Sequence, residues 1–376
     1  MTPTVGPDTD QDGVPTPGVG ARGTVSARSA ADTRERALAG ERVLSWLADV
    51  IAGRARPLGR VDDAFAGFIH GAQLDALAAA HGAVHPSFVK GQKGAFASAA
   101  GVERASADIV RHLGEAGVPS VTLKGPALGA RYWGDASLRS SSDVDILVAP
   151  HHERAAREAL ARAGFVPTAR YPDWYLRRLH YHVELRREQP RLTAELHWNV
   201  ARPAVGRLPV ERMIATAVRV PCDRCTLPAL RPRWQLVTGA VHAIQHKLGL
   251  RALVDLSFVA RSLTPEEWEE AVAEAEAAGL GPLVYYAVAV AAGRLRWQAP
   301  ASIERLRPGP ARDAAVRAFL SRLPRLAGFS LTQDRIWRVM MPLLAGSGWR
   351  WLRMLPLTLA DRPRLIRWAE ERRRRA

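Results

Sequence analysis

Two aspartates separated by one residue interrupt an otherwise apolar stretch in the sequence SDVDILV. Asp143 and Asp145 flank Val144, and the apolar residues ILV follow them. On a β-strand, side chains two residues apart point to the same side, so both carboxylates project together. Magnesium prefers oxygen ligands and often takes one or two carboxylates together with substrate phosphates. The pair therefore indicates a divalent-metal site, although Asp143 could instead form a structural ion pair with Arg139.

Residues upstream of the aspartates have the chemistry to bind phosphate. In VTLKGPALGARYW, Lys124 and Gly125 stand at a predicted turn from a strand into a helix. Glycine lets the backbone approach a ligand closely, and a helix N-terminus offers unpaired N–H groups to an anion. Arg139 and Ser142 come just before the aspartates, where they can contact phosphate oxygens. We therefore predict that these four residues bind a nucleotide.

A third carboxylate follows in the sequence AELHW. Glu195 and His197 stand two apart in a segment with strand-like alternation, so they share a face of that strand. Three carboxylates suit a clamp of two cations about 3.5–4 Å apart, which stabilises the attacking and leaving oxygens of phosphoryl transfer. This prediction depends on the strand of Glu195 lying beside that of the aspartates, which the sequence does not determine.

A further group of polar residues lies on predicted helices in VHAIQHKLGLRALVDL. His242 and His246 are four residues apart and share one helix face, and Asp255 follows nine residues later. Together with His197 they could contact the nucleotide or the acceptor. The alternative is that both histidines only pack or cap their helix.

These motifs, in their order, resemble a known family. The pattern LKGPAL…R…SDVDILV…ELHW, followed by H-x-x-x-H and an aspartate on helices, resembles the bacterial family of uncharacterised nucleotidyltransferases, within the polymerase-beta-type superfamily. The resemblance covers roughly residues 100–265. It implies that Asp143, Asp145 and Glu195 are the catalytic, metal-binding carboxylates.

The resemblance also exposes one departure. Gly125 matches the glycine of the Gly-Ser turn typical of the superfamily, but Pro126 stands where the serine is expected. Phosphate binding would then depend on Lys124, Arg139 and backbone amides.

The implied activity is the Mg²⁺-dependent transfer of a nucleoside monophosphate from an NTP to an acceptor hydroxyl, with release of pyrophosphate. Mn²⁺ could replace Mg²⁺, and the acceptor could be a small molecule, a peptide, a protein or a tRNA. Two alternatives stay open. One is a non-catalytic nucleotide- or RNA-binding protein on the same fold, and the other is a phosphotransferase that moves the γ-phosphate.

The elements that must position these residues fall into four stretches. Residues 1–35 are rich in Pro, Gly, Asp and Thr, and we expect a disordered tail. Helical periodicity fills residues 36–117, short strands mixed with helices fill 118–205, and residues 206–376 are expected to be helical. A capping box, Thr264 to Glu267, marks one helix start. The predicted class is α+β, with a small mixed-sheet nucleotidyltransferase core between N-terminal and C-terminal helical regions.

Composition limits the class of protein further. The formal charge of +16 makes polyanionic partners plausible without choosing among them. The two cysteines, Cys222 and Cys225, exclude a disulfide scaffold, and their C-x-x-C is interpreted as a surface turn rather than half a zinc site. The uncharged run 277–293 is expected to be a buried helix. We therefore expect a cytoplasmic protein without a membrane partner, and the sequence leaves its oligomeric state open.

Overall fold

The computed structural model describes residues 21–168, 172, 174–176, 180–203, 205–321 and 343–344, with side chains described from residue 34 onward. The first 20 residues and the basic C-terminal run lie outside these ranges. Helix α1 (Ala21–Ile51) begins within the segment 1–35 that the sequence predicts to be disordered.

A mixed seven-stranded sheet forms the centre of the fold, in the order β5-β6-β7-β4-β3-β9-β8. Its strands are β3 (Ser120–Thr122), β4 (Asp143–Val148), β5 (Val166–Pro167), β6 (His182–Arg187), β7 (Leu192–His197), β8 (Val218–Pro221) and β9 (Thr226–Ala229). A separate parallel pair consists of β1 (Gly59–Arg60) and β2 (Ala83–Val84). Mixed strand directions and separate groups of helices make this an α+β fold, as predicted.

Strand β4 lies in the middle of the sheet because it has hydrogen-bonded neighbours on both edges. It pairs antiparallel with β3 and parallel with β7. Its apolar residues Val144, Ile146, Leu147 and Val148 are all at most 1% exposed. A strand covered on both faces has a nearly continuous apolar sequence, which explains the run after the aspartates.

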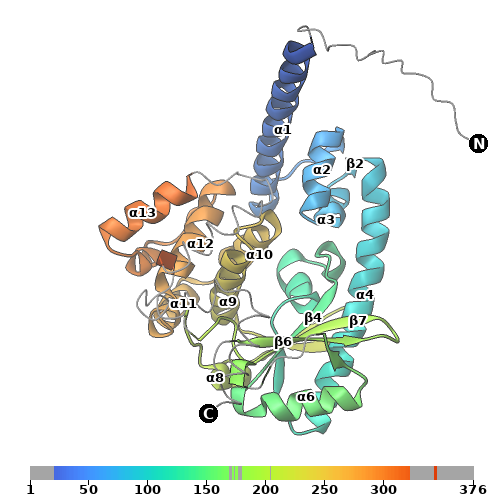
Figure 1. Cartoon of the computed structure of the whole chain (residues 1–376), viewed down its shortest axis with the longest axis vertical. Coiled ribbons are helices and arrows are strands. Elements are labelled where there is room, and N and C mark those ends of the chain that lie inside the picture. Colours follow the sequence, from blue (N-terminus) through green and yellow to red (C-terminus); the bar gives the residue numbers. More distant parts are fainter. Residues whose placement is uncertain are drawn as a thin grey trace, which may run out of the picture.

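The N-terminal half supplies one group of helices. It consists of α1, α2 (Asp63–Gly71), α3 (Asp75–Ala80) and α4 (Pro86–Glu115), and α6 (Glu153–Arg162) follows β4 along the chain. Helix α4 contacts β3, β4 and α6, and Figure 1 shows it running down one side of the sheet. The helix ends shortly before Gly117, whose φ of +69° favours glycine.

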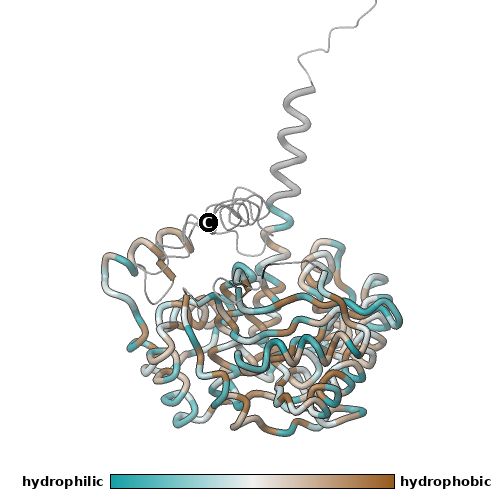
Figure 2. The backbone as a smooth tube through the Cα atoms, turned by 60° about the horizontal axis from the view of Figure 1, so that its bottom comes forward, coloured by the Kyte–Doolittle hydropathy of each residue, from teal (hydrophilic) through white to brown (hydrophobic). Residues whose placement is uncertain are grey.

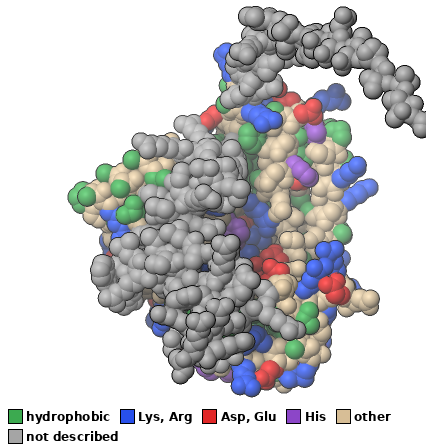
Figure 3. All heavy atoms as spheres, viewed as in Figure 1, with side chains coloured by type: hydrophobic (Ala, Val, Ile, Leu, Met, Phe, Trp, Pro, Cys, Tyr) green, Lys and Arg blue, Asp and Glu red, His purple; other side chains and the backbone are tan. Residues whose placement is uncertain are grey.

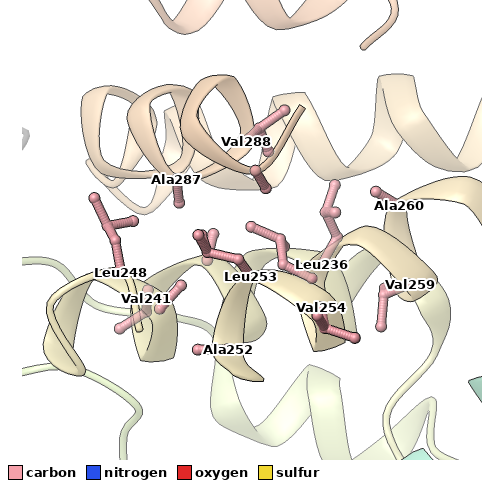
Figure 4. Packing of buried hydrophobic residues seen from close by; sticks show 14 of the residues in the cluster. Leu236, Val241, Leu248, Ala252, Leu253, Val254, Val259, Ala260, Ala287 and Val288 are labelled. Carbon is pink, nitrogen blue, oxygen red and sulfur yellow. The ribbon is translucent and has the colours of Figure 1, made fainter. Parts of the chain in front are cut away.

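The C-terminal half packs into a helical layer beside the sheet. Its helices are α8 (Val210–Ala215), α9 (Pro232–Gln245), α10 (Leu250–Ser262), α11 (Pro265–Ala277), α12 (Gly281–Arg294) and α13 (Pro310–Leu320). Figure 4 shows the contact of α9, α10 and α12, where Leu236, Leu253 and Val288 are fully buried. The predicted capping box is confirmed, because the Thr264 hydroxyl accepts from the Glu267 amide and the Glu267 carboxylate accepts from the Thr264 amide.

The region predicted to be helical almost throughout from residue 206 also contains the hairpin β8–β9, which extends the sheet past β3. The prediction missed it because Pro221, Pro228 and the C-x-x-C interrupt the alternation of VRVPCDRCTLPA. The cysteines lie at the hairpin turn, where the Cys222 amide donates to the Cys225 carbonyl oxygen at 2.8 Å. Their interpretation as a turn is confirmed.

The long uncharged run forms a buried helix, as predicted. Most of it is α12, whose residues Tyr286, Ala287 and Val288 are at most 1% exposed. Hydrophobic and hydrophilic stretches alternate along the elements in Figure 2. Among the described residues, none of the helices combines the length and the apolar character needed to cross a membrane.

The packing of α10 against α9 and α12 generates a stability prediction. Leu253→Ala removes a side chain that is 0% exposed, so we expect a loss of about 2–5 kcal/mol in the free energy of unfolding. Leu38→Ala is the matched control, because Leu38 is 59% exposed and should cost less than about 0.5 kcal/mol. Urea denaturation measures both, and equal losses would contradict the packing described.

Candidate active site

Two carboxylates meet at the boundary between strands β4 and β7. Because these strands are parallel neighbours, Asp145 lies directly opposite Glu195, while Asp143 lies opposite Thr193. The Asp145 side chain is almost fully buried, and that of Glu195 is 27% exposed. The strand adjacency that the sequence could not determine is therefore present.

Lys124 lies between the two aspartates. Its Nζ is 3.2 Å from Asp145 Oδ1 and 3.7 Å from Asp143 Oδ2. Burial alone would lower the pKa of Lys124, but the carboxylates of Asp145 and Asp143 outweigh burial and raise it. The side chain is therefore a charged ammonium that neutralises the pair. Its predicted contact with phosphate stays a prediction.

His197 forms a second positive partner for the carboxylates. Its Nε2 lies 3.3 Å from Asp145 Oδ1 and 3.2 Å from Glu195 Oε2. Burial would lower the pKa of His197, but its hydrogen bonds to both carboxylates raise it above the ordinary value. The same hydrogen bond and the charge of Lys124 overcome the burial of Glu195 and lower its pKa to about 2. Glu195 is thus a carboxylate at every working pH.

Three of these side chains form a set that could hold a metal ion. Asp145, Glu195 and His197 each offer a ligand atom, and these atoms lie within 4.8 Å of one another. Asp145 Oδ2 is buried and accepts no hydrogen bond within the described part of the chain. The oxygens suit Mg²⁺ or Mn²⁺, and an imidazole adds affinity for Mn²⁺. Asp143 lies outside this set, so its role as a metal ligand stays a prediction.

The turn after β3 differs from the predicted phosphate-binding helix start. Gly125 has φ of +80°, as expected of a glycine that allows a tight turn. The following α5 (Pro126–Leu128) has only three residues and continues into the π-helical turn Gly129–Trp133. A helix dipole therefore contributes little here. Ser142 is exposed at the start of β4 and does not line the pocket described below.

Arg139 is engaged with the C-terminal helices. Its Nε donates to Asp255 Oδ1 and its Nη2 to Asp255 Oδ2, both at 2.8 Å, and Arg139 is 1% exposed. Asp255, which we expected to contact substrate, is thus the partner of Arg139 and lies on α10. Arg139 Nη1 is buried and has no hydrogen-bond partner among the described residues. The predicted phosphate contact of Arg139 therefore depends on this one nitrogen.

A pocket of about 270 Å³ opens between the carboxylates and helix α9. Figure 3 shows basic, histidine and acidic side chains gathered near the centre of the face that it displays. The polar residues that line the pocket are Lys124, Arg139, Asp145, Tyr181, His182, Glu195, His197, Gln235, Thr238, His242, Gln245, His246 and Asp255. The structure thus brings most of the predicted candidates from the strands and from the helices to this pocket, whereas Gly125, Ser142 and Asp143 are not among its lining residues.

The two predicted helix histidines lie on the far wall of this pocket. The rings of His242 and His246 are 4.1 Å apart, centre to centre. Burial, followed by the positive charge of Lys124, lowers the pKa of both, so they are neutral at neutral pH. They can therefore accept as well as donate hydrogen bonds. Their contact with substrate stays a prediction.

Several pocket residues were not predicted, although they could have been found from their spacing in the sequence or from their position beside a strand. Gln235 and Thr238 precede His242 on α9 at spacings of three and four residues, so they extend one polar face of the helix. In HYH, Tyr181 directly precedes β6 and His182 is the first residue of that strand, and both rings lie next to the ring of His197. Burial and the neighbouring histidines lower the pKa of His182 to about 2.

The sequence of the chain agrees with this geometry. The family model described as "Uncharacterised nucleotidyltransferase" matches residues 70–296, well over half of the chain. The protein belongs to this nucleotidyltransferase family. The match confirms the resemblance, extends it beyond residues 100–265, and includes every candidate residue named above. No curated protein matches the sequence.

The buried ion pair of this nucleotidyltransferase predicts a coupling between its two halves. Arg139→Met or Asp255→Leu alone leaves one buried charge unpaired, and we expect each to lower the free energy of unfolding by about 3–5 kcal/mol. The double variant removes both charges, so its loss in the free energy of unfolding should be clearly smaller than the sum of the losses of the two single variants. Chemical denaturation of all four proteins measures this, and simple additivity would contradict a direct pair.

His242 predicts a pH dependence of stability. Lys124, Arg139, Arg251 and His246 face it, and burial holds its pKa well below 6.5. Below about pH 6.5 the unfolded chain binds a proton that the folded chain does not. The free energy of unfolding should therefore fall as the pH drops.

The loss should amount to at most about 1.4 kcal/mol per pH unit, because the unfolded chain binds at most one more proton at this residue than the folded chain does. His242→Gln should remove this part of the slope between about pH 6.5 and pH 5. Urea titrations of both proteins across that range measure the difference. Identical slopes would show that His242 is protonated in the folded chain.

Proposed function

We propose that the protein transfers a nucleoside monophosphate from an NTP to an acceptor hydroxyl, with release of pyrophosphate. One observation carries the proposal: Asp145 and Glu195 lie side by side on parallel strands and face a pocket. The family supports a transferase acting on nucleotides. Phosphoryl transfer needs mostly positioning and charge neutralisation. Paired carboxylates that lie beside the cationic side chains of Lys124 and Arg139 suit this chemistry.

Asp145 and Glu195 would hold a divalent cation, Mg²⁺ or Mn²⁺, with His197 or Asp143 as a further ligand. When bound, it would polarise phosphate oxygens and neutralise the charge of the triphosphate. Lys124 donates hydrogen bonds to phosphate oxygens from the same side.

Arg139 lines the pocket, and its Nη1, which has no hydrogen-bond partner among the described residues, would supply a further donor. Because Nε and Nη2 are fixed by Asp255, the guanidinium keeps its orientation while Nη1 contacts an anion. Such preorganised donors cost little reorganisation when charge develops.

The reaction forms one bond and breaks another at the α-phosphorus. The acceptor oxygen forms a new P–O bond, and the bond between the α-phosphorus and the bridging oxygen breaks, so that pyrophosphate leaves with the electron pair. The hydroxyl proton passes to the carboxylate of Glu195, which lines the pocket, and then to solvent. Because Glu195 is ionised, its carboxylate can accept a hydrogen bond from the acceptor hydroxyl before the reaction begins.

The acceptor or the nucleobase occupies the side of the pocket formed by α9. Neutral His242 and His246, together with Gln245 and Thr238, offer donors and acceptors without net charge. Such a wall suits a hydroxyl-bearing or heterocyclic group better than a phosphate. The acceptor would thus contact the C-terminal helices while the triphosphate contacts β3, β4 and β7.

Label transfer tests this function directly. Purified protein is incubated with Mg²⁺, a cell extract as the source of acceptor, and NTPs labelled at either the α- or the γ-phosphate. We expect label from the α position on an acceptor, and Asp145→Asn and Glu195→Gln should reduce it by about a hundredfold or more. Asp108→Asn, at a surface aspartate of α4, is the matched control and should leave transfer unchanged.

Two outcomes would contradict the proposal. Transfer of label only from the γ position would show a phosphotransferase instead. Retained nucleotide or RNA affinity with no transfer from either position would show a binding protein.

A further inference from the structure

The ammonium of Lys124 occupies the space that a second metal ion would need. In a two-metal site, both cations lie about 3.5–4 Å apart and share the paired carboxylates. Here Lys124 Nζ already lies within 3.2 Å of Asp145 and 3.7 Å of Asp143. A further ion bridging these two aspartates would lie directly against the ammonium charge.

The scaffold holds Lys124 in this place from both sides. The amide of the preceding Leu123 donates to the Asp145 carbonyl oxygen at 3.1 Å. The Leu123 carbonyl oxygen in turn accepts from Gln235 Nε2 of helix α9 at 2.9 Å. Gly125 and Pro126 then fix the turn that follows. The lysine side chain is 20% exposed, so it is a built-in part of the site rather than a surface group.

The set of side chains that could hold a metal ion shares Asp145 with the Lys124 contacts but does not include Asp143. Glu195 and His197 join Asp145 in the set that could hold an ion, and Asp143 does not. Asp145 Oδ2 is the buried carboxylate oxygen without a hydrogen-bond donor in the described chain, whereas Oδ1 faces both Lys124 and His197. Asp145 is thus common to both groups, while Glu195 and His197 belong to the candidate metal set and Asp143 belongs only to the contacts of the ammonium.

We infer that Lys124 replaces one of the two metal ions, so that the site binds a single divalent ion on Asp145 and Glu195. Asp143 then serves as the counter-ion of Lys124 rather than as a metal ligand. This inference rests on the proposed function and replaces the two-ion clamp expected from the sequence. It also gives a reason for a lysine next to the glycine of the turn, where the ammonium can face the same phosphates as the ion.

Counting bound Mn²⁺ tests the inference without any substrate. Mn²⁺ alone is titrated into the purified full-length protein, and free Mn²⁺ is measured by electron paramagnetic resonance. We expect one ion per chain for the wild type and two for Lys124→Gln. The added ion should be lost again in Lys124→Gln combined with Asp143→Asn. Lys90→Gln, at an exposed lysine of α4, is the matched control and should keep one ion.

Single aspartate variants keep the test decisive even if Lys124→Gln does not fold. Asp143→Asn should leave the affinity for the one ion nearly unchanged, while Asp145→Asn should weaken it on the order of tenfold or more. Circular dichroism verifies that each variant is folded. Two ions in the wild type, or equal losses in both aspartate variants, would overturn the inference.

The label-transfer assay separates this inference from the proposed function. Two bound ions together with transfer of the α-phosphate would reject the single-ion site and leave the proposed function standing. Absence of Mn²⁺ binding by the wild type would reject the single-ion site, and absence of transfer as well would reject both.

Discussion

The need to neutralise buried carboxylates is the constraint on which the rest of the structure depends. Asp145 lies almost fully buried beside Glu195 in the middle of a sheet, where unpaired charges would be strongly unfavourable. Lys124 from the neighbouring strand end and His197 from β7 itself supply the opposite charges. The order of the strands in the sheet therefore matters chemically, because the neighbours β7, β4 and β3 carry these groups to one place. A site that is balanced in this way can exchange or add cations without unfolding its surroundings.

A second buried pair connects this core to the C-terminal helices. Arg139 precedes β4, and Asp255 lies on α10, so their two hydrogen bonds fix the helical layer against the start of β4. Gln235 on α9 does the same for the end of β3 through the Leu123 carbonyl. The residues of both contacts, Arg139 with Asp255 and Gln235 with Leu123, line the pocket. The regions 118–205 and 206–376, which the sequence separates by composition, thus build one site, and neither would form it alone.

The aspartate pair and the fold class could be predicted because both have strong local signals, whereas the position of Glu195 beside Asp145 depends on the order of the strands. Paired aspartates in an apolar strand have few explanations, helical periodicity is clear in α10, and the long uncharged run indicates the buried helix α12. The β8–β9 hairpin was missed because prolines hide its alternation, and α1 extends into a segment whose composition suggested disorder. The partners of charged residues were the hardest to predict. Arg139 and Asp255 are 116 positions apart, and no local pattern shows that they pair rather than bind substrate. The same holds for Lys124, whose position between the aspartates depends on the packing of β3 against β4.

The central claim is that Asp145 and Glu195 together hold a divalent ion against the phosphates of a nucleotide. The most direct measurement is anomalous X-ray diffraction from crystals grown with Mn²⁺ and an NTP analogue that has a non-hydrolysable α,β-bridge. The account predicts an anomalous peak in contact with both carboxylates and with the triphosphate. A peak bound elsewhere, or a nucleotide that binds with its phosphates away from β4 and β7, would contradict it.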